Sequence, residues 1–304
     1  MNKTYNNFIK KTLISIKTLA LGIMILFISV ATAKAQTCTG TTANIPPNGT
    51  ITVNGVSVTS ASTGYVSQFG AFSGCSGVNL SNNNLYVGAT TGIDTGPWQT
   101  VLTFSKPVNN IIILLAAAGG NNNEKFYFTS NGGAISISST NNCYSVINGN
   151  SIFSGAGAPP SPGGGGIFQL TSPTSFTTLT MSGLGGMTGS LIGICSASIV
   201  ECTAGNTAVP LTGTTLNNSA NCSATTVNLN SLHTATAPGT SQLVWFTNDT
   251  HTGTVYATPT AATVGTYYAY YYDSTNSCYS PASSAVTVTI TPCCNAGNTG
   301  PNIN

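Results

Sequence analysis

The sequence predicts an all-β protein that folds into two consecutive β-sandwiches. Three observations support this prediction. Short runs rich in β-branched and aromatic residues recur along the chain, Gly, Asn, Ser or Pro separates them, and no stretch has apolar residues at the helical period. Many short strands punctuated by turns are typical of sandwiches and jelly rolls.

The first 35 residues have the pattern of an export signal. Four lysines precede an apolar run of 13 residues, Leu19 to Ala31, and Ala33-Lys34-Ala35 has the small-x-small pattern of a cleavage site before Gln36. A retained membrane anchor is the alternative, but a spanning helix needs about 18 apolar residues or more. We therefore expect cleavage near Ala35, no membrane span in the mature chain, and a secreted or cell-surface location.

From Gln36 onward the chain is weakly acidic. It keeps two lysines, Lys106 and Lys125, against five acids, which gives a formal net charge of −3, and it has no arginine. The five acids are Asp94, Glu124, Glu201, Asp249 and Asp273. Nucleic-acid binding requires a field of Lys and Arg against the phosphates, so the composition excludes this class of partner.

Residues 36–199 are predicted to form the first sandwich. Ile51 to Val58 has the pattern of a hairpin, because its Asn54-Gly55 turn accepts positive φ at both positions. The continuous apolar run "NIIILLAAAGG" predicts a central strand that is covered on both faces. Further strands are expected at "EKFYFTS", "AISISS", "GIFQLTS", "SFTTLTMS" and "GSLIGICSASIV".

The segment "WQTVLTFSKPV" alternates apolar and polar residues. It places Trp98, Thr100, Leu102 and Phe104 on one face of a strand. This segment, followed by "NNIIILL" and a late "GSLIGICS", loosely resembles jelly-roll modules of secreted bacterial proteins. The resemblance implies a jelly-roll-like fold for the first domain and says little about its function.

Residues 200–293 are predicted to form an immunoglobulin-like (Ig-like) sandwich. Strands are expected at "TTVNLNS", "QLVWFT", "TVYAT", "GTYYAYYY" and "SAVTVTI". Trp245 lies mid-strand, where this fold packs a tryptophan between its sheets, and Tyr267 is the candidate for a tyrosine corner. Ala269 takes the place of the usual second cysteine, so the disulfide between the sheets is absent and the cysteines must pair elsewhere.

The second domain also resembles a known family. The run "CTAGN", "CSATTVNL", "LVWFT", "ATVGTYYAYYYDSTNSC" and "SAVTVTI" is similar to the Ig-like repeats of secreted Bacteroidetes (Flavobacteria-type) surface proteins exported by the type IX route. The resemblance implies tandem repeats and a C-terminal sorting domain that engages the export machinery. Residues 294–304, "CNAGNTGPNIN", repeat the opening phrase "CTAGNT" and are interpreted as the truncated start of a second repeat; chance similarity is the alternative.

No catalytic constellation is recognisable in the sequence. His233 and His251 lack the neighbours of a zinc site, no Gly-x-Ser-x-Gly elbow occurs, and the glycine run at 163–166 lacks the Lys-Ser/Thr of a phosphate loop. The adjacent cysteines Cys293-Cys294 do not form a redox motif. We therefore expect a protein that is not an enzyme and has no cofactor and no metal.

The acidic residues favour structural roles. Glu124-Lys125 is interpreted as a solvated strand start, because charges are exposed by default. Asp94 and Asp273 occur in turn contexts and are expected to make Asx turns. Any calcium site in the first domain would depend on carbonyl oxygens, because Asp94 and Glu124 are its only acids.

Aromatic residues are the remaining candidates for ligand binding. Trp98 and Tyr127 in the first domain, and Tyr268 and Tyr270 in the second, could stack on sugar rings if their strands expose them. The alternative is that tyrosine simply favours strands. The sequence thus favours an adhesin-like protein that contacts glycans or other surface components, with Ig-like repeats as spacers. An ancillary region of a larger secreted hydrolase is the alternative function.

The cysteines are expected to form disulfides, as in exported proteins. Cys38, Cys75, Cys143 and Cys195 are an even set in the first domain with three connectivities. In an Ig-like sandwich, the first strand starts near the turn that follows "YYAYYYD", which brings Cys202 near Cys278. The strand after Cys222 starts at the other end, near Cys293.

We predict the disulfides Cys202–Cys278 and Cys222–Cys293, with Cys294 unpaired. Each closes a loop of more than 70 residues, so each is expected to stabilise the fold by about 3–5 kcal/mol. Peptide mapping under non-reducing conditions tests this pairing. A Cys222–Cys278 linkage would contradict both the pairing and the strand assignment.

Overall fold

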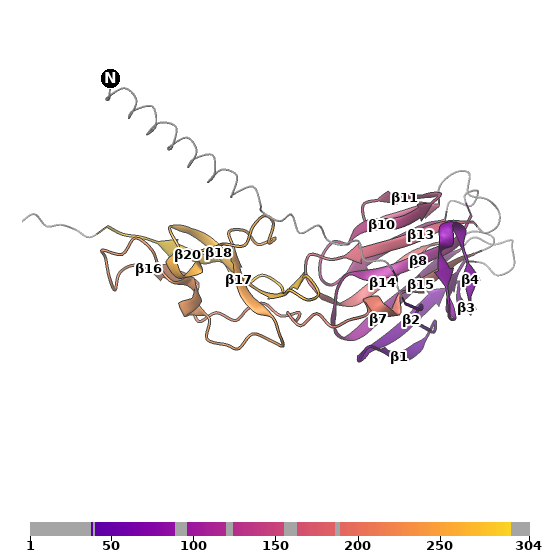
Figure 1. Cartoon of the computed structure of the whole chain (residues 1–304), viewed down its shortest axis with the longest axis horizontal. Coiled ribbons are helices and arrows are strands. Elements are labelled where there is room, and N and C mark those ends of the chain that lie inside the picture. The colour runs from indigo at the N-terminus through magenta and orange to yellow at the C-terminus, as the bar shows by residue number, and fades with distance from the viewer. Residues whose placement is uncertain are drawn as a thin grey trace, which may run out of the picture. The chain divides into compact units, whose positions relative to one another are not determined.

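The computed structural model describes residues 38, 40–88, 96–119, 124–154, 163–185 and 189–292 (Figure 1). The regular elements in these ranges are strands and short 3-10 helices, which confirms the all-β fold class. The described residues belong to one compact unit, residues 37–304. The predicted export signal and the segment 293–304 lie outside the described residues.

Two antiparallel sheets form the first domain (Figure 1). The seven-stranded sheet has the order β1 (Gly49–Val53), β2 (Val56–Gly64), β7 (Pro97–Val108), β14 (Phe176–Leu184), β9 (Lys125–Ser130), β12 (Ser151–Ser154) and β11 (Ser145–Asn148). The six-stranded sheet has the order β10 (Ser136–Cys143), β13 (Gly164–Thr171), β8 (Ile111–Ala118), β15 (Ser190–Ile194), β6 (Asn84–Val87) and β3 (Val66–Phe69). From β7 to β10, and again from β13 to β15, successive strands alternate between the sheets, which is a jelly-roll-like arrangement.

Two local sequence patterns in the first domain form the structures that they predicted. Val53 pairs with Val56 across the predicted two-residue turn, in which Asn54 and Gly55 both have positive φ. On β7, Trp98, Thr100, Leu102 and Phe104 are all buried, as their alternation predicted. The residues between them are exposed or half-buried.

Strand β8 is buried on both of its faces, as its continuous apolar run predicted. Ile111, Ile113 and Leu115 join the core between the two sheets. Ile112 and Leu114 join a second apolar cluster on the outer side of the six-stranded sheet. That cluster is covered by the chain around β4 (Phe72–Ser73), 3-10 helix η1 (Cys75–Gly77) and β5 (Asn79–Leu80).

Two disulfides attach chain segments to the outer side of the six-stranded sheet. Cys75, in η1, is bonded to Cys143 at the end of β10, with a Cα–Cα distance of 6.3 Å. Cys38 is bonded to Cys195 directly after β15, with a Cα–Cα distance of 5.7 Å. The structure thereby selects one of the three connectivities that the sequence left open.

The second domain contains one main sheet. Its order is β16 (Thr215–Asn217), β20 (Val286–Thr289), β18 (Gly265–Asp273) and β17 (Gln242–Phe246), with β19 (Cys278–Tyr279) also paired to β18. The order β17-β18-β20 corresponds to the C-F-G sheet of an Ig-like domain. Strand β16 runs parallel to β20, whereas the other pairs are antiparallel.

The layer opposite this sheet has fewer strands than expected. The predicted strand "TTVNLNS" is reduced to a single bridge between Val227 and Ala262, followed by 3-10 helix η4 (Leu229–Leu232). The predicted strand "TVYAT" has no ladder, and 3-10 helix η5 (Pro259–Ala261) follows it. Trp245 fills the space between the layers, since it is 1% exposed and its Nε1 donates to Asn230 Oδ1 at 2.8 Å.

The predicted tyrosine corner is confirmed. The Tyr267 hydroxyl donates to the carbonyl of Thr263 at 3.0 Å, and the ring is buried. Cys202 is bonded to Cys278 with a Cα–Cα distance of 6.3 Å, which is the predicted pair. Cys222 is also disulfide-bonded. Its predicted partner, Cys293, lies outside the described residues, so the pair Cys222–Cys293 stays a prediction.

Hydrogen bonds join the first domain to the second within the compact unit. Cys202 N donates to Pro107 O at 2.7 Å, Ser175 N donates to Tyr279 O at 3.0 Å, and Asn110 Nδ2 donates to Asn276 O at 2.9 Å. The junction also contains the ion pair between Lys106 and Glu201, with an Nζ–Oε2 distance of 2.6 Å. Backbone and side-chain contacts therefore attach the first domain to the second domain.

Asp273 organises the second domain's side of this junction. Its buried carboxylate accepts hydrogen bonds from the backbone N–H groups of Thr203, Thr275 and Asn276 and from Asn276 Nδ2. Burial raises the pKa of this carboxyl, but the hydrogen bonds from Thr203 and Asn276 outweigh burial, so the net pKa is below its usual value. Asp273 thus has the turn role predicted from sequence, and it anchors Thr203 as well.

Replacing Asp273 with Asn should destabilise the protein by about 2 kcal/mol at pH 7, because one amide oxygen cannot accept four hydrogen bonds. The carboxylate's contribution is present above its ordinary pKa of 3.8. It is lost as pH falls through the lower folded value, so the two proteins should converge in acid. Urea unfolding at several pH values measures this difference. The exposed Asp249→Asn is the matched control; an equal effect in the control would contradict the prediction.

Candidate functional site

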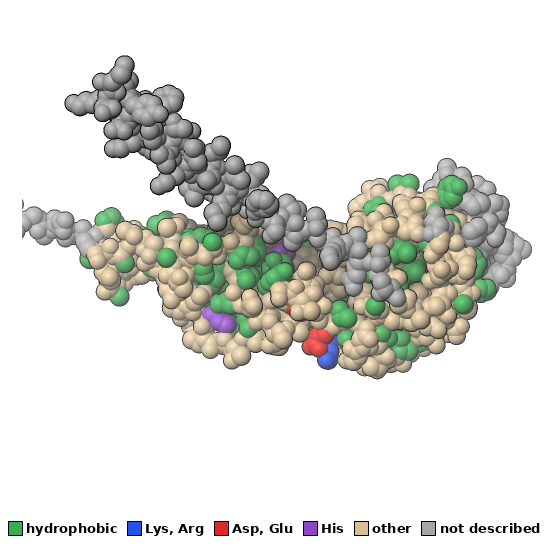
Figure 2. All heavy atoms as spheres, in the orientation of Figure 1, with side chains coloured by type: hydrophobic (Ala, Val, Ile, Leu, Met, Phe, Trp, Pro, Cys, Tyr) green, Lys and Arg blue, Asp and Glu red, His purple; other side chains and the backbone are tan. Residues whose placement is uncertain are grey.

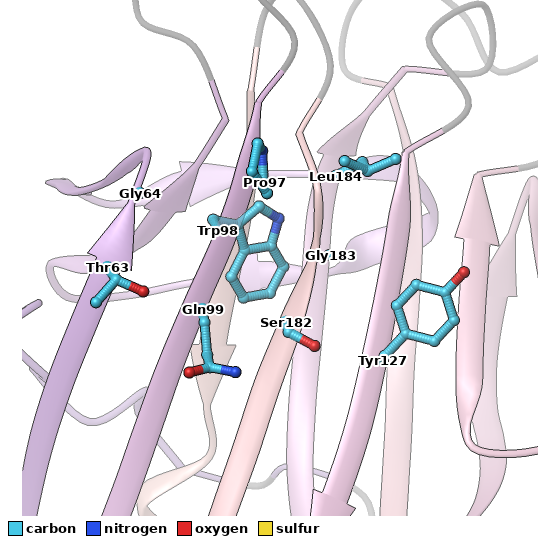
Figure 3. Close-up of a pocket in the computed structure, with 9 residues that line it drawn as sticks. All are labelled: Thr63, Gly64, Pro97, Trp98, Gln99, Tyr127, Ser182, Gly183 and Leu184. Carbon is cyan, nitrogen blue, oxygen red and sulfur yellow. The ribbon is translucent and has the colours of Figure 1, made fainter.

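A groove lies on the outer face of the seven-stranded sheet (Figure 3). Its volume is about 490 Å³, and it crosses the ends of β2, β7, β14 and β9. The lining residues are Thr63, Gly64, Pro97, Trp98, Gln99, Tyr127, Ser182, Gly183 and Leu184. None of them is charged, so the groove offers hydroxyl, amide, aromatic and aliphatic groups.

Strand register explains the order of these side chains. Thr63 pairs with Gln99, Gln99 with Ser182, and Ser182 with Tyr127, which makes one continuous row across four strands. The row faces outward because the intervening residues of each strand point into the core. In Figure 3, Thr63 stands on the strand at one side of the groove and Tyr127 on the strand at the other.

Two glycines shape the floor of the groove. Gly64 and Gly183 pair with Trp98 from either side. A Cβ on Gly64 would clash with the carbonyl of Pro97, and one on Gly183 would clash with the carbonyl of Lys125. No side chain can therefore be added at either position without a shift of the neighbouring backbone.

Trp98 and Tyr127 are the two sequence candidates that the structure brings together. Trp98 is only 3% exposed and packs on Phe126, with ring centroids 6.1 Å apart, so its ring face cannot stack on a ligand. Its buried Nε1 has no hydrogen-bond partner among the described residues. Tyr127 is 37% exposed and presents its ring. Tyr127 therefore provides the exposed aromatic surface of the groove, whereas the Trp98 donor is enclosed in the core.

Tyr268 and Tyr270 belong to a different cluster, in the second domain. Tyr270 is fully buried, and burial raises the pKa of its hydroxyl to about 12. Its ring contacts Phe246, His251 and Tyr279 at centroid distances between 5.4 and 6.2 Å. Tyr268 is half-buried and pairs with Phe246. The sequence left open whether this face of the strand is exposed or covered, and neighbouring rings cover Tyr270.

His251 closes this aromatic cluster. Its backbone has a positive φ of 44°, and its ring stacks on Tyr279 at 4.3 Å. Burial among uncharged rings lowers the pKa of His251, because the charged imidazolium is poorly solvated there. The other histidine, His233, forms a hydrogen bond of 2.8 Å with the Tyr271 hydroxyl. Both histidines therefore have structural partners.

The interpretation of Glu124 as a solvated charge was wrong. Glu124 is fully buried, and its Oε2 accepts hydrogen bonds from Gly119 N at 2.8 Å and from the Ser190 hydroxyl. Burial, and secondarily the charge of Glu124, raises the pKa of Tyr86. Sequence composition alone could not show that Ser190, 66 residues away, would supply a partner.

One cluster of metal-type ligands occurs among the described residues. Cys202, Asp273 and Cys278 lie together, and all three are buried. The two sulfurs are joined in a disulfide and cannot act as thiolate ligands. Asp94 lies outside the described residues. The described part of the chain therefore provides no built metal site at this cluster.

No family model, curated protein or solved structure matches the chain. Among the described residues, no helix has the length and apolarity needed to cross a membrane. The three disulfides between described residues are typical of proteins that fold in an oxidising compartment.

His251 should make the stability of the second domain depend on pH. Because its folded pKa is lowered, its neutral-state contribution is complete above the ordinary value of 6.5 and is lost as pH falls below it. His251→Asn keeps a residue that tolerates positive φ but removes the titrating ring. Urea unfolding between pH 5 and 8 should show a smaller loss of stability on acidification in this variant. Parallel pH profiles for both proteins would contradict the assignment.

Proposed function

We propose that the protein is an exported, non-enzymatic, adhesin-like protein that binds glycan in the groove of the seven-stranded sheet. The observation that carries the proposal is the outward-facing row Thr63, Gln99, Ser182 and Tyr127 across four neighbouring strands. Sugars combine apolar ring faces with many hydroxyl groups. The groove supplies the complement, because Tyr127 offers a ring and the other members of the row offer hydroxyl and amide groups.

The shape of the groove favours an extended glycan over a single sugar unit. Neighbouring strands lie about 4.8 Å apart, so a row of four strands spans about 14 Å. The row runs across the strands on the outer face of the sheet, where the groove is open. An extended glycan can therefore lie across β2, β7, β14 and β9 with successive units over successive strands.

The absence of acids and histidines from the lining supports binding rather than hydrolysis.

The second domain serves as a spacer in this proposal. Its resemblance to Ig-like repeats of secreted surface proteins supports this role, together with the disulfide and hydrogen bonds that fix its start to the first domain. The disulfides and the sequence pattern of an export signal support an extracellular location.

Tyr127→Ala should weaken glycan binding by about tenfold, because exposed aromatic contacts commonly dominate such surfaces. A glycan array followed by titration of the best binder, using residues 36–304, measures the effect. Tyr144→Ala is the matched control, since Tyr144 is an exposed tyrosine outside the groove. Thermal unfolding checks that both variants are folded. An array with no binding, or equal affinities for Tyr127→Ala and the wild type, would refute the proposed site.

A further inference from the structure

Two lysines occur after residue 36, and their environments differ. Lys106 is neutralised, because its Nζ lies 2.6 Å from Glu201 Oε2. Lys125 has no carboxylate within ion-pair distance and no hydrogen bond from Nζ among the described residues. On the face shown in Figure 2, charged side chains form a small blue and red spot within an uncharged surface. Among the described residues, Lys125 is thus the lysine that has no carboxylate partner.

Lys125 stands at the border of the groove. It lies two residues before Tyr127 on β9, so both side chains leave the same outer face of the sheet. It also pairs with Leu184, which lines the groove. The ammonium group is therefore placed beside the row that the proposed glycan would occupy.

Phe153 holds this ammonium group in place. The Lys125 Nζ lies 5.6 Å from the centroid of the Phe153 ring, and that ring meets Tyr127 edge-to-face at 6.0 Å. A cation–π contact orients the ammonium without neutralising it. The three residues form a continuous edge on which an aromatic face and a positive charge are available together.

We propose that the groove selects glycans with an anionic sugar unit, and that Lys125 pairs with its carboxylate or sulfate while Tyr127 stacks on a sugar ring. This inference rests on the proposed glycan-binding function. The net charge of −3 after residue 35 means that a polyanion is not attracted to the protein as a whole. Recognition must come from the local cation, so glycans with one acidic unit among neutral ones fit better than densely charged polymers.

Affinity electrophoresis with matched polysaccharides tests the inference. The probes are xylan without and with glucuronic acid substituents, dextran, carboxymethyl dextran and dextran sulfate. The wild-type chain, residues 36–304, should bind at least one anionic form about three- to fivefold more tightly than its neutral counterpart, as an exposed ion pair allows. The preference should decrease as NaCl increases, because salt screens exposed charges. The carboxylate and sulfate arms show which anion is recognised.

Lys125→Gln should remove the preference for the anionic form and leave binding of the neutral form unchanged. Lys106→Gln, which removes the other lysine, should keep the preference. Equal binding of neutral and anionic forms by the wild type, with sensitivity to Tyr127→Ala, would overturn this inference and leave the glycan site standing. Loss of the preference in Lys106→Gln as well would also overturn it. No binding of any probe or array glycan would instead refute the proposed function itself.

Discussion

The double-sided burial of strand β8 determines the layout of the first domain. Its six buried residues from Ile111 to Ala116 need apolar neighbours on both sides of one sheet. The sandwich interior covers one side only, so the chain around η1 must cover the other, where two disulfides attach it. This leaves the outer face of the seven-stranded sheet, where exposed and buried residues alternate along β7, as the open face of the sandwich. The groove lies on that face.

Hydrogen bonds of amide and hydroxyl side chains connect separate chain segments here, a role that charged groups have in other proteins. Asn218 alone donates to the carbonyls of Cys222, Ala224 and Thr291 and accepts from Thr291 N. Asn131 Oδ1 accepts from the backbone of both Thr177 and Thr178. Such neutral links do not titrate, so few groups can make the fold sensitive to pH. The clearest pH-sensitive groups are Asp273, which is held by hydrogen bonds, and His251, which packs against aromatic rings.

Sequence patterns predicted the elements whose signals are local. The Asn54-Gly55 turn, the alternation along β7 and the tyrosine corner at Tyr267 depend on residues that are close in the chain. The errors concern burial, which depends on distant partners. Glu124 is buried because Ser190 and Gly119 supply donors, and Tyr270 is buried because His251 covers it. The groove itself could not be foreseen, since it depends on the register that brings Thr63, Gln99, Ser182 and Tyr127 from four strands into one row.

The disulfide Cys202–Cys278 has a mechanical consequence for a chain that is pulled from its two ends. Tension that enters at Cys202 crosses the sulfur bridge directly to Cys278, with which it is covalently continuous. The two cysteines have a sequence separation of 76. The residues between them, which include β16, β17 and β18, lie outside the covalent path of the force. Strands β16 and β18 bear load only through their hydrogen bonds to β20, which lies in the segment after Cys278. The cross-link thus carries force between the two cysteines over a Cα–Cα distance of 6.3 Å.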